Sequence, residues 1–286
     1  MDHTPRVAAV HDLSGFGRCS LTVILPVLSV MGVQVSPIPT AILSTHTGGF
    51  GDVVMRDLTD YLAPCLEHYK SQEIEFECVY SGFLASENQV DHCLEFFRSY
   101  PEAFKVVDPV MGDHGKPYKT YTKAMQKRMA ELVRVADLIT PNVTEACILL
   151  GEEYDHNPIT RQQAKSALVR LSEMGPRYVV ITGVQLASGT MTNVGYDRER
   201  NAFWMVPCEY VPASYPGTGD MYASVLIGGF LSGDSLPIAM DRATRFTELA
   251  IQTTFSYGTD TRCGVQLERV LGWLTQQTVL KGYQIL

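Results

Sequence analysis

Along most of the chain, short runs of apolar and β-branched residues alternate with longer segments of helical spacing. The plainest strand reads Tyr-Val-Val-Ile-Thr at 178–182 and is bounded by Pro and Gly. We also expect strands at 6–11, 33–39, 77–82, 104–107 and 137–140. Alternation of this kind predicts parallel strands joined through helices, and therefore a doubly wound α/β sheet with helices on both faces.

Two further strands, 190–196 and 202–206, flank a short polar turn and predict a late antiparallel hairpin at one edge of the sheet. The two prolines within 33–39 favour an edge position for that strand as well. Ser86 or Asn88 is expected to cap one helix through its side-chain oxygen, and Thr160 another. Helices are expected in the apolar stretch that ends at 31, and at 52–71, 86–100, 122–135, 141–151, 161–174, 220–231, 235–255 and 265–278.

The composition fits a globular enzyme, with 286 residues, 45% hydrophobic and 19% charged, and no linker, so we expect a single domain over 1–286. A net charge of −8 argues against a nucleic-acid partner, which usually needs a basic patch. The seven cysteines form no CxxC pair, which predicts reduced thiols. No secretory signal pattern is found, and the apolar run 23–35 is too short for a membrane span, so we expect a cytoplasmic protein without a membrane partner.

A Gly-rich turn precedes the late predicted helix and reads Ser-Tyr-Pro-Gly-Thr-Gly-Asp at 214–220. Glycines let the backbone turn sharply and approach a ligand, and the first N–H groups of a helix lack intrahelical partners. Gly217, Thr218 and Gly219 therefore predict an anion pocket, with the Asp220 carboxylate at its edge to accept a proton. The alternative is structural, because Asp220 would also suit the cap of a helix after a Gly turn.

Polar residues follow the ends of other predicted strands. Asp108 and Asp113 share one loop, and two carboxylates suit a hydrated Mg²⁺ ion, although a solvated acidic loop is the alternative. Glu145 lies near a helix start, where a carboxylate also serves as a capping acid. Because loops after parallel strands meet at one edge of a sheet, the following residues are expected to converge: Asp12, Thr47, Asp108, Thr140, Thr182 and Asp220.

Two N-terminal segments are expected to belong to the same site. Residues 12–17 read Asp-Leu-Ser-Gly-Phe-Gly and predict a ligand-facing loop between the first strand and the first helix, with a plain turn as the alternative. Residues 40–51 are small, polar and Gly-rich, which is typical of a mobile flap or a pocket wall. His46 within this segment is, by itself, more typical of a structural histidine than of a catalyst.

In combination these motifs resemble those of pyridoxal kinases in the ribokinase-like superfamily, and the resemblance runs from Val7 to the helix after Asp220. Residues 217–220 are similar to the superfamily's anion hole and catalytic base. Residues 108–113 (Asp-Pro-Val-Met-Gly-Asp) are similar to the DPVxGD segment, and 140–145 to the TPN-x-x-E segment. Residues 44–48 (Ser-Thr-His-Thr-Gly) resemble the SNHTG segment that lines the vitamin pocket. The four motifs in this order and spacing make the resemblance specific.

The resemblance implies a homodimer that phosphorylates the 5′-hydroxymethyl group of pyridoxal, pyridoxine or pyridoxamine with ATP. Asp220 would accept the hydroxyl proton while the N–H groups of residues 217–219 stabilise the transferring phosphoryl group. The implied Mg²⁺ ligands are Asp108, Asp113 and Glu145, and a monovalent cation such as K⁺ is implied nearby. The implied nucleotide contacts are Asp108, Tyr118, Thr140, Glu145, Thr182, Tyr215, Pro216 and Thr218. The implied vitamin contacts are Asp12, His46, Thr47 and Phe83.

Three departures from the family leave the substrate open. Asp12 stands where the family usually has the Ser that contacts the vitamin's ring nitrogen, and a carboxylate there would favour a protonated pyridinium. Residues 12–17 thereby also resemble the DPSGGAG loop of hydroxymethylpyrimidine kinases. Phe83 replaces a common Tyr, and residues 48–51 lack the family's aromatic pattern.

Two alternatives therefore stand beside a pyridoxal kinase. One is a hydroxymethylpyrimidine kinase or a related small-alcohol kinase. The other belongs to a different class, a non-catalytic protein that binds a B6 vitamer or a nucleotide. The intact Asp220 speaks against this second alternative, since a binding protein needs no proton acceptor there.

Overall fold

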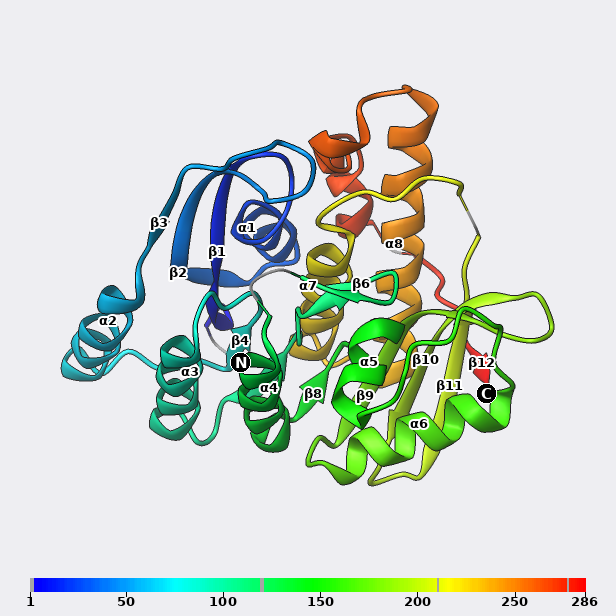
Figure 1. Ribbon diagram of the computed structural model, residues 1–286, viewed down its shortest axis with the longest axis horizontal. Helices are drawn as coiled ribbons and strands as arrows, with labels where there is room; N and C mark the ends of the chain where they lie inside the picture. Colours follow the sequence, from blue (N-terminus) through cyan, green and yellow to red (C-terminus); the bar gives the residue numbers. More distant parts are fainter. Residues whose placement is uncertain (1–2, 119–120, 210, 277) are drawn as a thin grey trace.

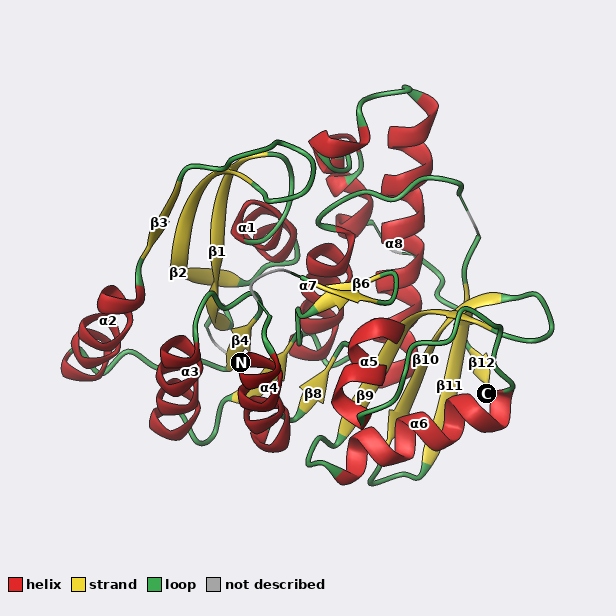
Figure 2. Cartoon of the chain, in the orientation of Figure 1, coloured by secondary structure: helices red, strands yellow, loops and turns green. Residues whose placement is uncertain are grey.

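The computed structural model describes residues 3–118, 121–209, 211–276 and 278–286. Within these ranges the central sheet has ten strands in the order β12-β11-β10-β9-β8-β5-β4-β1-β2-β3 (Figures 1 and 2). Strands β2, β1, β4, β5, β8 and β9 pair in parallel, whereas β3 and the run β10–β12 pair antiparallel at opposite edges. The predicted doubly wound, mostly parallel sheet with a late hairpin is therefore confirmed.

The strands are β1 Arg6–Phe16, β2 Gln34–Thr45, β3 Met55–Asp57, β4 Cys78–Ser81, β5 Phe104–Val107, β6 Gly112–Asp113, β7 Lys116–Pro117, β8 Leu138–Ile139, β9 Tyr178–Gln185, β10 Met191–Asp197, β11 Ala202–Pro207 and β12 Gln284–Ile285. The helices are α1 Leu21–Val30, α2 Thr59–Ser71, α3 Glu87–Ser99, α4 Lys123–Val135, α5 Val143–Leu150, α6 Arg161–Glu173, α7 Thr218–Leu231 and α8 Leu236–Ser256, with 3₁₀ turns η1 Thr261–Cys263, η2 Leu267–Arg269 and η3 Leu271–Thr275. Strands β6 and β7 form a small separate hairpin.

Two hydrophobic cores lie on the two faces of the sheet. Helices α2 to α6 pack into one core, and α1, α7, α8 and the turns η2 and η3 pack into the other. In β1, Ala8 and Val10 belong to the first core and Val7 and Ala9 to the second, and all four are fully buried. A strand that is buried on both faces reads as a continuous apolar run, which is why its first half is predictable from the sequence.

Several helices begin as their sequences predict. Thr160 accepts the N–H of Gln163 while the Gln163 side chain accepts the N–H of Thr160, which forms a capping box at α6. Asn142 and Glu145 form the same reciprocal pair at α5. Ser86 does stand at the start of α3, but its hydroxyl makes no capping hydrogen bond, contrary to the expectation.

The first two strands are longer than the sequence predicts. β1 continues through residues 12–16, for which a loop is expected, and β2 continues through residues 40–45, for which a flap is expected. The two strands stay paired as far as Phe16 and Thr45, with a register shift after His11. The hydrogen bonds of this long pair outweigh the local preference of Gly and small polar residues for loops.

Of two further expectations at this edge, one is confirmed and one is wrong. The predicted strand 33–39 does lie at the edge of the sheet, because β3 pairs with β2 only at residues 41–43 and, among the described residues, leaves the outer side of the stretch with Pro37 and Pro39 without a neighbouring strand. Residues 55–57 are used for β3, so α2 begins at Thr59 and not at residue 52.

The C-terminal segment does not form the helix predicted at 265–278. It forms the successive 3₁₀ turns η2 and η3, and residue 277 lies outside the described residues. Leu267, Val270 and Leu274 are buried in the second core, so short turns bury the apolar side chains without a continuous helix. The chain then adds β12 antiparallel to β11.

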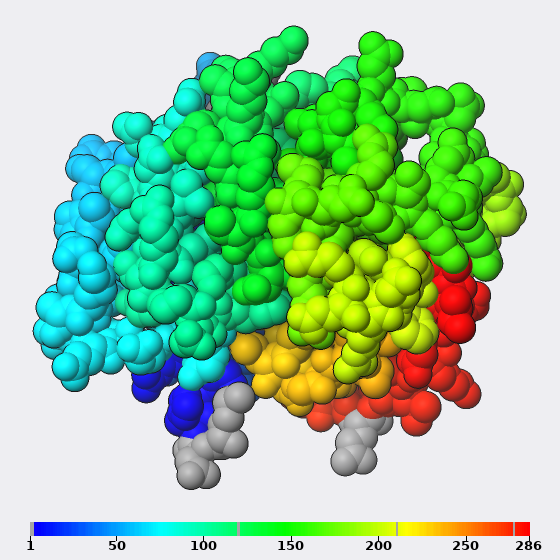
Figure 3. Space-filling view, turned by 90° about the horizontal axis from the view of Figure 1, so that it is seen from below, coloured from blue at the N-terminus to red at the C-terminus, as the bar shows by residue number. Residues whose placement is uncertain are grey.

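Segments from both ends of the chain reach one side of the molecule. In the space-filling view, the first described residues (blue) and the last segments (orange and red) lie along the same edge (Figure 3). Within the described ranges, no helix combines the length and the apolar character needed to cross a membrane.

Candidate active site

A pocket of about 660 Å³ opens where the chain leaves β5 and β8, beside β9 and the start of α7. Five carboxylate residues line it: the predicted Asp108, Asp113, Glu145 and Asp220, and in addition Asp155. The other predicted residues on its wall are Tyr118, Thr140, Thr182, Tyr215, Pro216, Gly217, Thr218 and Gly219. The structure therefore brings the predicted catalytic, nucleotide and metal residues together at one edge of the sheet.

Gly217 sets the turn that opens the pocket. It is the N-cap residue of α7 with a φ of 80°, and a Cβ at this position would lie 2.0 Å from the carbonyl oxygen of Arg18. Only glycine fits such a contact in this backbone conformation. Gly219 is different, because its nearest contact for a Cβ is an ordinary 3.9 Å to Asp108 Oδ2. The turn therefore depends on Gly217, and room for a ligand is the remaining reason for a glycine at 219.

The carboxylate of Asp220 does not cap α7. The alternative interpretation, in which Asp220 serves only as a helix cap, is therefore wrong. No side-chain capping bond is present at this helix start. Instead, Asp220 Oδ2 accepts the backbone N–H of Ser20 at 2.7 Å, and Oδ1 lies 3.0 Å from His11 Nε2. Asp220 is 8% exposed and lines the pocket, so a buried carboxylate faces the space in front of the helix N-terminus.

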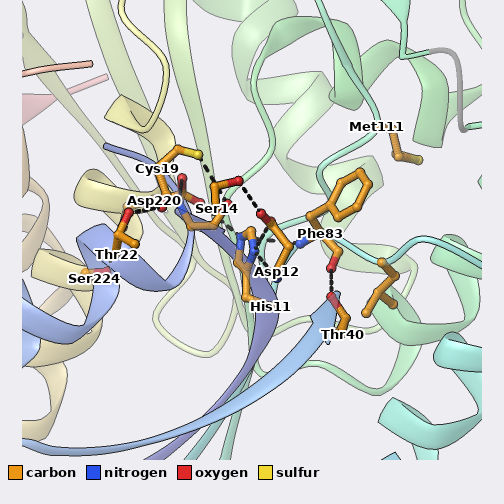
Figure 4. Close-up of polar contacts among 12 residues, drawn as sticks. His11, Asp12, Ser14, Cys19, Thr22, Thr40, Phe83, Met111, Asp220 and Ser224 are labelled. Atoms are coloured by element: carbon orange, nitrogen blue, oxygen red, sulfur yellow. Dashed lines mark hydrogen bonds and ion pairs between the residues drawn. The ribbon is translucent and has the colours of Figure 1, made fainter. Parts of the chain in front are cut away.

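His11 is a site residue that the sequence reasoning missed. Its Nδ1 lies 2.9 Å from Asp12 Oδ1, so the imidazole stands between Asp12 and Asp220 (Figure 4). Burial would lower the pKa of His11, but the charge of Asp220 and hydrogen bonds to both carboxylates raise it to about 10. The available signal was a histidine directly before an aspartate at the end of a buried apolar run.

Among the predicted metal ligands, the buried carboxylate of Asp108 is the best suited to bind a metal ion directly. Burial, and then the negative charge of Asp220, raise its pKa to about 7. The hydroxyl of Thr140 on the same wall is buried and makes no hydrogen bond of good geometry among the described residues, although it lies near enough to the Asp108 carboxyl to oppose the rise in its pKa. A buried polar atom without a partner is costly unless a ligand satisfies it, so this wall suits phosphate oxygens.

Glu145 and Asp113 suit direct metal binding less well. Glu145 accepts the N–H of Met111 at Oε1 and the N–H of Asn142 at Oε2, and burial raises its pKa well above the usual range. The Asp113 side chain is 46% exposed and accepts the N–H of His114. Within the described part of the chain, no group of three or more His, Cys, Asp or Glu side chains is arranged to hold a metal ion. A Mg²⁺ ion would therefore rely on phosphate oxygens and water, with Asp108 as the best-placed carboxylate.

The four predicted vitamin contacts do not line this pocket. Both oxygens of Asp12 have protein partners, His11 and the hydroxyl of Ser14. The backbone nitrogen of Phe83 lies 3.3 Å from His11 Nε2. These residues therefore adjoin Asp220 through His11, and their contact with a substrate stays a prediction (Figure 4).

The other two predicted vitamin contacts lie directly after the end of β2. His46 Nε2 lies 2.6 Å from the carbonyl oxygen of Arg262, and its Nδ1 accepts the N–H of Gly48. The ring of Phe50 packs edge-on against it. Thr47 is exposed. His46 thus joins the end of β2 to the segment after α8, and its role towards a substrate stays a prediction.

Comparison with known proteins assigns the family. The model of the phosphomethylpyrimidine kinase family matches residues 25–264. The chain belongs to this family. The predicted ribokinase-like fold and the resemblance to pyridoxal kinases are confirmed, and the protein is a kinase that transfers a phosphoryl group to an alcohol.

Solved structures of related proteins cover nearly the whole chain. A protein of Bacteroides thetaiotaomicron, provisionally named a phosphomethylpyrimidine kinase and crystallised with pyridoxal, is 42% identical, with a TM-score of 0.94 over 99% of this chain and 100% of that one. Pyridoxal kinase from Lactobacillus plantarum is 30% identical, with a TM-score of 0.87 over 95% and 97%. The thiamine biosynthetic bifunctional enzyme of Arabidopsis thaliana is 28% identical over 86% of this chain, and the match spans 46% of that enzyme.

Proposed function

We propose that this kinase phosphorylates the 5′-hydroxymethyl group of a B6 vitamer with ATP. The observation that carries the proposal is the buried carboxylate of Asp220, which faces the same pocket as the open N-terminus of α7. Asp220 takes the hydroxyl proton as the substrate oxygen attacks the γ-phosphorus. A new O–P bond forms, the bond from the γ-phosphorus to the β–γ bridging oxygen breaks, and ADP leaves with that electron pair. The N–H groups of residues 217–219 stabilise the charge on the phosphoryl oxygens.

The same pocket is proposed to hold the nucleotide. The phosphates would contact Thr140, Thr182 and Thr218, with the unpartnered Thr140 hydroxyl as the supporting observation. Tyr118, Tyr215 and Pro216 line the pocket and would contact the rest of the nucleotide.

Bound Mg²⁺ would neutralise developing charge on the phosphates. Asp108 is proposed to contact it directly, whereas Glu145 acts through water because both of its oxygens already accept backbone N–H groups. Asp113 at the rim would act through water as well. A monovalent cation such as K⁺ is proposed nearby.

A B6 vitamer is favoured by the pyridoxal in the related Bacteroides thetaiotaomicron structure. Hydroxymethylpyrimidine, free or phosphorylated, is the second candidate substrate, because the family model bears the name phosphomethylpyrimidine kinase and residues 12–17 resemble the corresponding kinase loop. A B6 vitamer and free hydroxymethylpyrimidine both present a primary alcohol on an aromatic nitrogen ring, so the same base and anion hole would serve either; the phosphorylated pyrimidine would instead offer a phosphate oxygen as the acceptor.

A kinase assay with purified protein, ATP and Mg²⁺ tests the proposal against both candidates. We expect release of ADP with pyridoxal, pyridoxine or pyridoxamine, and a phosphorylated product identified by mass spectrometry. Turnover with hydroxymethylpyrimidine but with no B6 vitamer would identify the second candidate as the substrate. Tight binding of one ligand without turnover of either would favour the non-catalytic binding protein.

We further propose that the chain is one domain, acts in the cytoplasm and forms a homodimer. The seven cysteines are all free thiols, as expected in a reducing compartment. Exposed apolar residues lie along the β3 edge of the sheet, on β1 (Phe16), β2 (Ile42), the residue before β3 (Val54) and β3 itself (Met55), and an apolar edge of this kind suits a second copy of the chain. Light scattering coupled to size exclusion tests the dimer, and Val54→Asp together with Met55→Asp should shift the mass to that of a monomer.

A further inference from the structure

His11 is a buried imidazole held between two carboxylates, and the proposed reaction does not use it. Its side chain is 2% exposed, with Nδ1 2.9 Å from Asp12 Oδ1 and Nε2 3.0 Å from Asp220 Oδ1. Figure 4 shows the ring between the two acidic side chains, one on β1 and one on α7. It therefore joins an N-terminal strand to the proposed base.

The surroundings of the ring fix its position. A Cβ on Gly82 would lie 1.9 Å from His11 Cδ2, so the ring fits only because residue 82 is glycine. The ring of Tyr80 packs edge-on against it, with centroids 6.3 Å apart. Asp12 is itself held by the hydroxyl of Ser14, which donates to Oδ2 at 2.8 Å. The imidazole has a rigid support on the side away from Asp220.

Asp220 is held at both oxygens as a result. Ser20 donates its backbone N–H to Oδ2 from a residue with a φ of 56°, a conformation that non-glycine residues rarely adopt. Nε2 of His11 faces the other oxygen. Two contacts from different directions define the plane of a carboxylate, whereas one alone would leave it free to rotate.

The charge of the ring supports the same role. Nδ1 lies 2.9 Å from an oxygen of Asp12 and Nε2 lies 3.0 Å from an oxygen of Asp220, so a positive charge on the ring is attracted to both carboxylates. The raised pKa of His11, about 10, is in accord with a ring that donates to both carboxylates at neutral pH.

We propose that His11 is a positioning residue for the phosphoryl transfer: it orients the Asp220 carboxylate towards the substrate hydroxyl, and Asp12 orients His11. This inference rests on the proposed function of Asp220 as the base. In this arrangement Asp12 influences the reaction through the imidazole, and its carboxylate need not touch the substrate.

Substitution of His11 tests this role through the separation of kcat from KM. His11→Leu should lower kcat by about 10²-fold, the scale of a misplaced catalytic group, while KM for ATP changes little. His11→Gln retains an N–H donor that reaches towards Asp220 and should recover part of that loss. His92→Gln, on α3 and outside the pocket, is the control for a histidine-to-glutamine change and should match the wild type. Equal activity of the wild type and His11→Leu would overturn the proposal.

A double-mutant cycle separates positioning from a merely structural role. If His11 acts through Asp220, adding His11→Gln to Asp220→Asn should cost no more than about a further twofold in kcat, since interacting residues are not additive. A full, additive loss in the double variant would show that His11 supports the fold and not the base, and would overturn the proposal.

Nitrogen NMR of the histidine rings tests the contact without turnover. We expect two protonated ring nitrogens on His11 at pH 7.5, with the Nε2 resonance shifted in Asp220→Asn and the Nδ1 resonance shifted in Asp12→Asn. If the chemical shift of His11 Nε2 is the same in the wild type and in Asp220→Asn, the inference is overturned even when the enzyme is active. If the expected shifts appear but the wild type phosphorylates neither candidate substrate, the proposed function fails while the His11–Asp220 contact stands.

Discussion

The two sides of Asp220 are built in different ways. On one side, the segments after β5 and β8 and the start of α7 leave an open pocket, lined by the residues that the motifs predict. On the other side, at the ends of β1, β2 and β4, the predicted side chains bond to the protein itself, as Asp12 does to His11 and Ser14. The first side offers free surface to a ligand, whereas the second supports the residue between them.

The two sides differ in whether their structure depends on one stretch of backbone or on side chains from several strands. The anion-binding turn depends on backbone geometry within one stretch, so its glycines and following helix are visible in the sequence. The support of Asp220 depends on side chains from separate strands, and no local pattern records which of them will meet.

Asp220→Asn, at the residue between the two sides, is the substitution with the largest expected effect on kcat. The amide keeps the shape of the side chain but cannot take the proton, so kcat should fall about 10²–10⁴-fold while ATP affinity, measured by calorimetry, stays close to the wild type. Asp234→Asn, in the turn after α7 and bound to Arg242, serves as the control. A loss in kcat below tenfold would remove Asp220 from the role of base.

A matched pair of glycine variants sharpens the description of the open side. Gly217→Ala places a Cβ against the Arg18 carbonyl at a positive φ and should lower the free energy of unfolding by about 1–3 kcal/mol. Gly219→Ala has room for its Cβ and should leave the unfolding free energy unchanged or raise it, while weakening nucleotide binding. Urea unfolding of both variants checks this, and a larger destabilisation from Gly219→Ala would contradict the assignment of the turn to Gly217.

Asp12→Asn probes the supporting side with a smaller expected effect. If Asp12 acts through His11, kcat should fall roughly tenfold with little change in KM for the alcohol, because the carboxylate positions a group and does not bind substrate. If Asp12 instead faces a ring nitrogen, the pH dependence of that KM should change and kcat should hold. Steady-state kinetics between pH 6 and 9 distinguish the two outcomes.

Stability should also depend on pH through His11. Burial opposes the charged form of His11, but Asp220 and Asp12 raise its folded-state pKa from 6.5 to about 10. A group with a raised pKa contributes its full stability below pH 6.5 and loses it as the pH rises through 10. Urea unfolding should therefore show a difference between wild type and His11→Gln that shrinks from pH 6.5 to 10. A difference that stays constant would mean that the ring is not held as a cation.

The sequence predicts most of this architecture because its elements are strongly patterned. The buried parallel strands read as apolar runs, and β9 is the clearest of them. The reciprocal caps at Thr160 and Asn142 follow from residues only three positions apart. The hairpin of β10 and β11 has the expected alternation and turn.

The remaining features depend on contacts that are distant in sequence. Residues 12–16 look like a loop by local preference, yet pairing with β2 holds them in β1. The segment after α8 has helical spacing, but it is divided into 3₁₀ turns that fit the side chains into the second core. His11 gave no motif of its own, because its partners lie on β1 and on α7 and only the fold brings them together.

The bond between Ser20 and Asp220 has a consequence for biosynthesis, since it spans 200 residues of sequence. The segment that carries His11 and Ser20 is synthesised well before Asp220, and contacts of such sequence separation must close a long loop, which slows their formation. Until Asp220 is made, the nascent N-terminal strand holds a histidine and an aspartate without their third partner. Catalytic competence should therefore appear only after β1 and α7 have docked.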